Sequence, residues 1–146
     1  MKKPGQPTAN DITRKILLEH PIRFPGSRLF RRNVGTFYGV HTVGSVRAAL
    51  RAGNTVAAIT ILNQARPVIC GTPGEPDCDG FVPVRIGGKL VGVRLGCEVK
   101  AAGDRLSPEQ GRYRDMAQAG GCIWIEARGV EEYFEELGEA LKELKG

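Results

Sequence analysis

A pair of glycines between two alternating segments is the feature that most restricts how this chain can fold. The sequence FVPVRI at positions 81–86 precedes the glycine pair, and KLVGVRLGCEVK at positions 89–100 follows it. Apolar residues recur at every second position, as expected for strands that bury one face in a core. Because two glycines accept the positive φ angles of a two-residue turn, the segment predicts an antiparallel hairpin.

The turn also fixes which residues face each other across this hairpin. If the two glycines form the loop, Ile86 pairs with Lys89, and the numbers of facing residues always add up to 175. The same register places Asp77 opposite Glu98, with Cβ atoms about 4.5–5.5 Å apart if the ladder has no bulge. Two facing carboxylates repel each other, so their position needs an explanation.

A divalent cation between Asp77 and Glu98 would relieve this repulsion. Carboxylate oxygens suit magnesium or manganese, and a metal ion held by them can bind a phosphate oxygen and lower the pKa of a bound water. Lys100 lies two residues beyond Glu98 on the same strand face, where an amine can orient water or offset negative charge. The pattern predicts hydrolysis of a phosphodiester. The alternative is that Glu98 and Lys100 form an exposed ion pair of the common, weak kind.

The composition is that of a globular protein with a modest positive charge. The chain has 146 residues and a formal net charge of +5. This length suits one domain, and the charge suits a polyanionic partner, although a soluble protein can also be basic without one. No apolar run reaches the roughly 20 residues of a membrane span, and the first ten residues lack the apolar core of a secretion signal. We therefore expect a cytoplasmic protein with no membrane partner.

The remaining patterns predict helices and strands in an order typical of an α/β sandwich. A short helix is expected from a cap at Asn10 to a stop before Pro21, and helices are also expected after caps at Ser45 and Ser107 and over residues 131–144. Further strands are expected at residues 28–35, 55–62 and 122–127, the second of them from a short apolar run that could also be helical.

Four short motifs resemble, in the same order, those of the VRR-NUC domain, a branch of the PD-(D/E)xK nucleases. They are GTPGEPD (71–77), EVK (98–100), RLSPEQ (105–110) and a glycine pair followed by IWIEAR (123–128). The resemblance covers most of residues 10–130. It implies a restriction-endonuclease-like fold, which is a three-layer α/β sandwich with a mixed central sheet flanked by helices.

The domain organisation expected from this resemblance is simple. Residues 1–9 would be a flexible arm, and residues 10–146 would form a single nuclease domain. Within it, residues 39–70 exceed what a minimal domain of this family needs. This insertion would supply a dimer surface or a DNA-binding flap, or it would merely extend an edge strand.

The resemblance also implies a role for individual residues. It assigns the metal to Asp77, Glu98 and the Val99 carbonyl, and it assigns catalysis to Lys100 and Gln110. For Gln110 the sequence offers a second role, because SPEQ is also a capping box at the start of a helix.

A basic segment, FRRN, precedes the expected metal site, as in the family. Arg31, Arg32 and Asn33 would contact phosphates of DNA, unless they are simply solvated. The first helix of such nucleases often adds an acid to the site, but Ala9 stands at the matching position. Asp11 and Glu19 are the nearest substitutes, and neither fits well.

Two functions remain open at this point. The first is a DNA endonuclease that depends on Mg²⁺ or Mn²⁺ and cuts branched or structured DNA, such as a Holliday junction or a flap, as a homodimer with two active sites. The second is a non-catalytic DNA-binding protein that has kept the nuclease fold. The missing acid of the first helix favours the second function, and the Asp77, Glu98 and Lys100 set favours the first.

Overall fold

The computed structural model describes residues 6–32 and 35–145, and the chain divides into two compact units. The first unit comprises Met1–Arg32 together with Pro73–Gly146, and the second comprises Asn33–Thr72. The expected insertion at residues 39–70 lies inside the second unit. Most of the expected N-terminal arm lies outside the described residues, and its last residue, Ala9, already belongs to the first helix.

A mixed four-stranded sheet forms the centre of the first unit. Its strands lie in the order β1-β4-β5-β6. β1 pairs antiparallel with β4 and β4 with β5, whereas β5 and β6 run parallel. The strands are β1 (Arg28–Arg31), β4 (Cys78–Ile86), β5 (Lys89–Val99) and β6 (Ile123–Ala127). Because parallel neighbours need a long crossover, a helix connects the last two strands.

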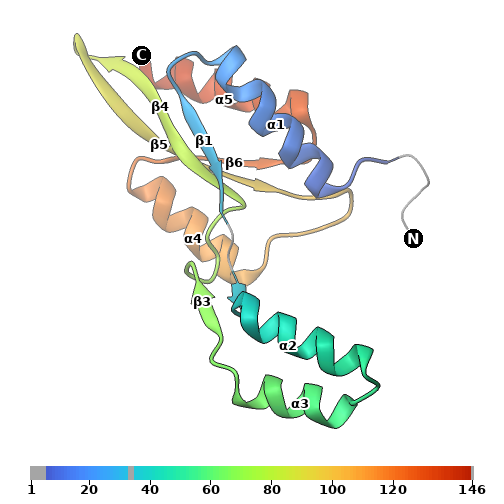
Figure 1. The fold of residues 1–146 in the computed structure, drawn as a ribbon. Helices are drawn as coiled ribbons and strands as arrows, with labels where there is room; N and C mark the ends of the chain where they lie inside the picture. The colour runs from blue at the N-terminus through green and yellow to red at the C-terminus, as the bar shows by residue number, and fades with distance from the viewer. Residues whose placement is uncertain (1–5, 33–34, 146) are drawn as a thin grey trace. The chain divides into compact units, whose positions relative to one another are not determined.

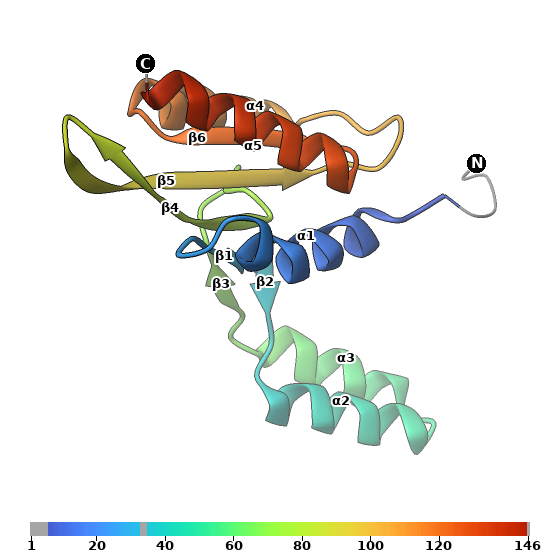
Figure 2. The ribbon, with the colours of Figure 1, turned by 90° about the horizontal axis from the view of Figure 1, so that it is seen from above.

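Three helices cover the two faces of this sheet. They are α1 (Ala9–Arg23), α4 (Pro108–Ala119) and α5 (Val130–Lys145). α1 and α5 contact each other and share one face, and α4 packs on the opposite face next to β6 (Figure 1). Figure 2 shows the order of the strands from above, with α5 over β5 and β6 and α1 beside β1. The prediction of an α/β sandwich with a mixed sheet is therefore confirmed.

The core lies between the sheet and the α1–α5 face. Alternate residues of the hairpin point into it, and the buried apolar stripe of α5 covers them. Each large side chain buried here contributes about 1.5–3 kcal/mol. The fully or almost fully buried members include Ile16, Val82, Val84, Leu95, Cys97, Tyr133 and Leu137.

The register of the hairpin is the one expected from its turn. Ile86 pairs with Lys89, and the ladder continues without a bulge to Cys78 and Cys97. The two turn glycines have φ angles of 55° and 80°, as a two-residue turn requires. The ladder therefore delivers the residue before Cys78 and the residue after Cys97 to one end of the sheet.

β1 approaches β4 more closely than a side chain would allow. Leu29 of β1 faces Gly80 of β4. A Cβ atom on Gly80 would lie 2.0 Å from the carbonyl oxygen of Arg28. Only glycine fits at this crossing, and the close contact brings the arginines of β1 beside the first half of β4.

The second unit consists of a helical pair and a two-stranded ribbon. Its elements are β2 (Gly35–Phe37), α2 (Val40–Arg51), α3 (Thr55–Gln64) and β3 (Val68–Cys70). β2 and β3 pair antiparallel, and α2 packs against α3.

Two predictions for the second unit are wrong. The strand expected at 55–62 is the helix α3, whose first turn is capped by the Asn54 side chain accepting from the Ala57 amide. A cap of this kind decides a short apolar run in favour of a helix. The helix expected after Ser45 begins earlier, at Val40, so Ser45 lies inside α2.

The limits predicted for the first helix are also wrong. Its cap is Thr8 rather than Asn10, because Thr8 and Asp11 bond reciprocally in a capping box. The helix also continues through Pro21 to Arg23. A proline this close to the end removes one helical hydrogen bond without stopping the last turn.

In the described residues, no helix is long and apolar enough to cross a bilayer.

Candidate metal and catalytic site

A buried carboxylate, Glu98, lies at the end of β5 on the face that α4 covers. Only 2% of its surface is exposed. Its Oε2 accepts the Asp77 amide at 3.2 Å, and its Oε1 lies 2.7 Å from Lys100 Nζ. Burial raises the pKa of the Glu98 carboxyl, the bond to Lys100 lowers it in part, and the negative charge of Asp77 raises it again. Positive charge brought to this point would therefore stabilise ionised Glu98.

Asp77 stands one residue before β4 and interlocks with the end of β5. Its Oδ2 accepts the Val99 amide at 3.0 Å, while its own amide donates to Glu98. The Asp77 carboxylate thus bonds to the backbone next to Glu98, and the Glu98 carboxylate bonds to the backbone of Asp77. The structure brings the two carboxylates together at the end of the hairpin, where the register of the turn predicted them.

Lys100 and Gln110 complete a hydrogen-bonded cluster with Glu98. Lys100 Nζ donates to Gln110 Oε1 at 2.8 Å, and Gln110 Nε2 donates to Glu98 Oε1. The side chain of Lys100 is 13% exposed. The Glu98–Lys100 contact is thus a largely buried pair, and the alternative of an exposed pair along one strand is wrong.

The side chain of Gln110 also caps α4, so both roles expected for it are combined. Its Oε1 accepts the Ser107 amide at 2.9 Å, and its own amide donates to Ser107 Oγ at 3.2 Å. These bonds form the predicted capping box. The cap holds the amide group in the orientation that reaches Lys100 and Glu98.

A glycine seats the loop before β4 against the first turn of α4. Gly74 has a φ angle of +90°, and a Cβ atom there would lie 2.4 Å from the Glu109 carbonyl oxygen. No other residue fits both the angle and the contact. The GTPGEPD motif thus places Asp77 on one side of the cluster while α4 places Gln110 on the other.

Val99 belongs to the site through its backbone. Its side chain is buried in the core, and its amide donates to Asp77. Metal binding by its carbonyl oxygen stays a prediction.

The two arginines expected to contact DNA, Arg31 and Arg32, lie at and just beyond the end of β1. Arg31 faces Cys78 in the ladder and donates to the Asn10 side chain at 2.7 Å. The amide of Arg32 donates to the Asp77 carbonyl at 2.7 Å, and its guanidinium pairs with Glu75 at 3.2 Å. Asn33 lies outside the described residues, so its expected DNA contact has no structural counterpart here.

The possible additional acid, Asp11, is engaged at the start of α1. Its Oδ2 accepts from the Thr8 hydroxyl at 2.6 Å and from the Thr8 amide at 2.9 Å. These bonds to Thr8 hold the pKa of Asp11 below its ordinary value. Within the described residues, the structure joins Asp77, Glu98, Lys100 and Gln110 by hydrogen bonds and does not join Asp11 to them.

A second polar cluster lies next to the site, and the sequence did not predict Arg94 and Tyr113 as members of it. Asp79 accepts two bonds from Arg94, both at 3.0 Å, and Arg94 also donates to the Tyr113 hydroxyl at 3.1 Å. Tyr113 follows Gln110 by three residues, so α4 is tied to the sheet at two successive points. The register could have revealed Arg94, because it lies on the strand face of Glu98.

The donor set of the main cluster fits a hard divalent cation. Asp77 and Glu98 supply carboxylate oxygens, which magnesium and manganese prefer. Burial raises the pKa of Glu98, and the negative charge of Asp77 raises it further. No group of three or more His, Cys, Asp or Glu side chains suited to a metal occurs in the described residues. A metal here would rely on the two acids together with backbone, water or phosphate oxygens.

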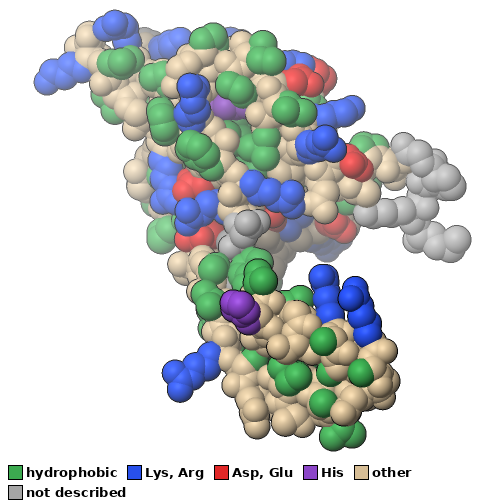
Figure 3. All heavy atoms as spheres, in the orientation of Figure 1, with side chains coloured by type: hydrophobic (Ala, Val, Ile, Leu, Met, Phe, Trp, Pro, Cys, Tyr) green, Lys and Arg blue, Asp and Glu red, His purple; other side chains and the backbone are tan. Residues whose placement is uncertain are grey.

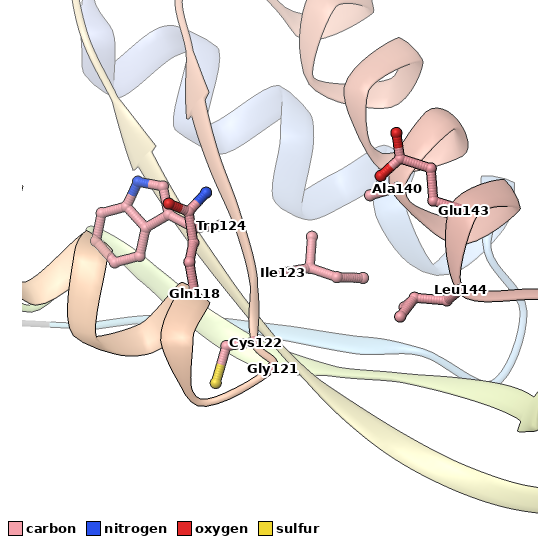
Figure 4. A pocket seen from close by; sticks show the side chains of 8 residues that line it. All are labelled: Gln118, Gly121, Cys122, Ile123, Trp124, Ala140, Glu143 and Leu144. Carbon is pink, nitrogen blue, oxygen red and sulfur yellow. The ribbon is translucent and has the colours of Figure 1, made fainter.

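The pocket shown in Figure 4 lies elsewhere, at the free edge of β6 between α4 and α5. Its volume is about 380 Å³. Trp124 and Gln118 line it on the α4 side, and Ile123 lies toward Leu144 of α5. It contains none of the predicted site residues. Trp124 itself is 9% exposed.

Comparison of the chain with protein-family models, with curated proteins and with solved structures found no match. The resemblance to VRR-NUC nucleases therefore stays a prediction from the four short motifs.

Proposed function

We propose that this protein is a DNA endonuclease that depends on Mg²⁺ or Mn²⁺ and hydrolyses phosphodiester bonds in branched or structured DNA. The observation that carries the proposal is the buried Glu98 joined to Asp77, Lys100 and Gln110 at the end of one hairpin. Burying a carboxylate costs free energy unless an opposite charge, hydrogen bonds or a metal ion compensate its negative charge. Here the pair of acids leaves more negative charge than one lysine balances.

Asp77 and Glu98, with the Val99 carbonyl, would hold the metal in this mechanism. The ion supplies a positive charge for the phosphate oxygen and acidity for a bound water. Hydrolysis adds water to phosphorus and breaks one P–O bond to deoxyribose, leaving a phosphate monoester and a hydroxyl. The chain's own residues orient the reacting groups and stabilise the charge that develops on the phosphoryl oxygens.

Lys100 is placed for that task by its two partners. An ammonium group has three N–H donors, and Glu98 and Gln110 accept two of them. The third donor is available for a phosphoryl oxygen or for the attacking water. Gln110 acts as a positioning residue, because its amide bonds to Lys100 and Glu98 while the capping box holds it in place.

We further propose that the enzyme acts as a homodimer in the cytoplasm, so that two active sites cut two strands of one junction. The free state of Cys78 and Cys97, both buried and paired across the hairpin, is consistent with a reducing compartment.

The alternative function, a non-catalytic DNA-binding protein, is favoured by one specific observation. Asp11 is engaged in a helix cap, so the first helix contributes no acid that bonds to the described site. In that reading Glu98 and Lys100 are a buried structural pair.

The experiment that tests the proposal is cleavage of a labelled four-way DNA junction with Mg²⁺, with Mn²⁺ and with EDTA. We expect products only with a divalent metal, and we expect the metal to raise the melting temperature of the wild-type protein because it binds the folded state. In Glu98→Gln both the cleavage and the metal-induced rise should fall, since one ligand charge is gone. A wild-type protein that neither cuts nor gains stability from any divalent metal would favour the DNA-binding alternative.

DNA affinity should fall steeply as the salt concentration rises. The net charge of +5 and the arginines of β1 motivate this expectation, because phosphate contacts release counterions. Arg31→Ala with Arg32→Ala should weaken binding to all DNA sequences alike and flatten the salt dependence, since phosphate contacts carry no sequence information. Fluorescence anisotropy between low and high salt measures both effects. Salt-independent binding would contradict the proposed interface.

A further inference from the structure

Beyond the candidate site, the sheet face that α4 leaves open carries two exposed aromatic rings. Phe30 of β1 is 58% exposed, and Phe81 of β4 is 43% exposed. Phe30 faces Asp79 in the ladder and Phe81 faces Arg94. Because facing residues share one side of a sheet, both rings lie on the side where Asp79 and Arg94 bond to each other and Arg94 to Tyr113. This is also the side of Glu98.

Arginines accompany the rings on the same face. Arg28 faces Phe81 across β1 and β4, and Arg85 lies four residues beyond Phe81 on β4. Their guanidinium groups bond to backbone carbonyls, Arg28 to Ser27 at 2.7 Å and Arg85 to Gly88 at 3.5 Å. Within the described residues neither has a carboxylate partner. We call the four side chains Arg28, Phe30, Phe81 and Arg85 the aromatic platform.

The platform residues lie in two stretches of sequence without acidic residues, and Asp79, the acid that faces Phe30, is paired with Arg94. No Asp or Glu occurs between residues 20 and 74, and none occurs between residues 80 and 97. In Figure 3 lysine or arginine side chains and hydrophobic side chains share the projecting end of the β4–β5 hairpin, at the upper left. The surface therefore matches a partner that is negatively charged and offers flat apolar surfaces.

The two rings are near neighbours. Phe30 and Phe81 are diagonal across the β1–β4 ladder, a relation that places residues about 7–8 Å apart. Gly92, opposite Pro83 on the same face, leaves open space, because a Cβ atom there would meet nothing within 4 Å. A planar group can therefore approach the rings from the solvent side.

We propose that the aromatic platform binds a single-stranded segment of DNA, with unpaired bases stacked on Phe30 and Phe81 and phosphates held by Arg28 and Arg85. Stacking on aromatic side chains beside a positively charged groove is how proteins bind single strands without reading sequence. In a duplex the faces of the bases are already stacked, so the rings require unpaired bases. The inference rests on the proposed function: it names an unpaired strand beside the cleavage site as the substrate feature that the enzyme recognises.

The test measures binding of two fluorescein-labelled oligonucleotides of equal length and charge, an oligo(dT) and its abasic counterpart, in EDTA. The wild-type protein should bind oligo(dT) more tightly than the abasic strand. Phe30→Ala and Phe81→Ala should each weaken oligo(dT) binding by about 5- to 150-fold and should reduce the difference between the two strands, and the double variant should abolish it. Phe81→Trp should keep the affinity, and its fluorescence should be quenched by oligo(dT).

The matched control replaces two exposed apolar side chains outside the platform. Leu18 and Ile22 of α1 are 64% and 77% exposed, and Leu18→Ala with Ile22→Ala should bind oligo(dT) as the wild type does. Thermal melts of all variants confirm that they are folded, as expected for surface changes.

Two results would overturn the inference. One is equal wild-type affinity for the oligo(dT) and abasic strands. The other is unchanged oligo(dT) binding by the two phenylalanine variants. If these variants bind oligo(dT) as the wild type does but change their oligomeric state, the platform is a protein-binding surface. Because binding is measured without metal, it is separable from catalysis. Junction cleavage without base-dependent binding would refute only the platform, and base-dependent binding without cleavage would refute only the nuclease.

Discussion

The Lys100→Ala protein should cleave a DNA junction about 100- to 1000-fold more slowly than the wild type, the usual cost of losing one group that stabilises developing charge. The amine acts when negative charge grows on the phosphoryl oxygens, so the loss should fall on the rate of cleavage. DNA affinity should change little, because the proposed phosphate contacts are made by other residues, Arg31 and Arg32. Single-turnover cleavage with Mn²⁺, with binding measured in EDTA, separates the two quantities.

This variant also has a cost in stability. From the alternation of the strand alone, Lys100 is expected on an open polar face where truncation is harmless. In the structure it is the counterion of the buried Glu98. Removing it leaves that carboxylate without its charged partner, and the loss of one partner of a buried ion pair commonly destabilises a protein by about 3–5 kcal/mol. A thermal melt must therefore show that the variant is folded at the assay temperature.

Lys142→Ala is the matched control. The Lys142 side chain is 79% exposed and is 3.7 Å from Glu139, a surface pair on the same helix. Its loss should change neither cleavage nor the melting temperature appreciably. If the wild type cuts and folded Lys100→Ala cuts equally fast, the assigned role of Lys100 is wrong.

The second large effect is a loss of stability in acid that depends on His20. This histidine of α1 is fully buried, and its Nδ1 lies 2.8 Å from the hydroxyl of Tyr133 on α5. Phe24 also packs against the imidazole. Burial lowers the pKa of His20 to about 4 from its ordinary value of 6.5. The folded protein therefore holds the imidazole neutral.

The direction of the effect follows from this shift. In the unfolded chain His20 takes up a proton below pH 6.5, whereas in the folded protein it does so only near pH 4. The contribution of neutral His20 to the free energy of unfolding is thus fully present above pH 6.5, and it is lost as the pH falls toward 4. The difference in pKa corresponds to about 3 kcal/mol, a large share of the roughly 5–15 kcal/mol that stabilises a typical domain.

Urea unfolding between pH 7 and pH 4 measures this contribution. His20→Gln removes the titrating group but keeps an oxygen that can accept from Tyr133. Its free energy of unfolding should decline less over this range than that of the wild type. The slopes are compared rather than the absolute stabilities, because a buried glutamine has its own cost. Parallel pH profiles for the two proteins would show that His20 does not dominate the acid response.

The parts of the fold that were predictable from the sequence are those decided by local rules. The glycine turn set the hairpin register as far as Cys78 and Cys97, and the SPEQ box set the start of α4. Both depend on a few adjacent residues. The segment at 55–62 was not decided in this way, since its apolar run fits a strand or a helix and the side chain of Asn54 selects the helix.

The sequence predicted which residues form the candidate site, but it did not predict how deeply they are buried. The register brought Asp77 and Glu98 to one place, yet it says nothing of what covers them. Burial of Glu98 depends on where α4 packs, which is a tertiary property. The hydrogen bond from Arg94 to Tyr113 could not be predicted for the same reason. It joins β5 to α4, and a loop separates these two elements in the sequence.

The side chain of Gln110 shows why glutamine and its isostere glutamate are not equivalent at this position. A capping box accepts either residue, because only one oxygen is needed for the backbone amide. The cluster needs a group with two different ends, since Oε1 accepts from Lys100 while Nε2 donates to Glu98. Glutamate would offer an acceptor at both ends and a third negative charge. Helix formation alone therefore leaves the choice open, and the neighbouring carboxylate decides it.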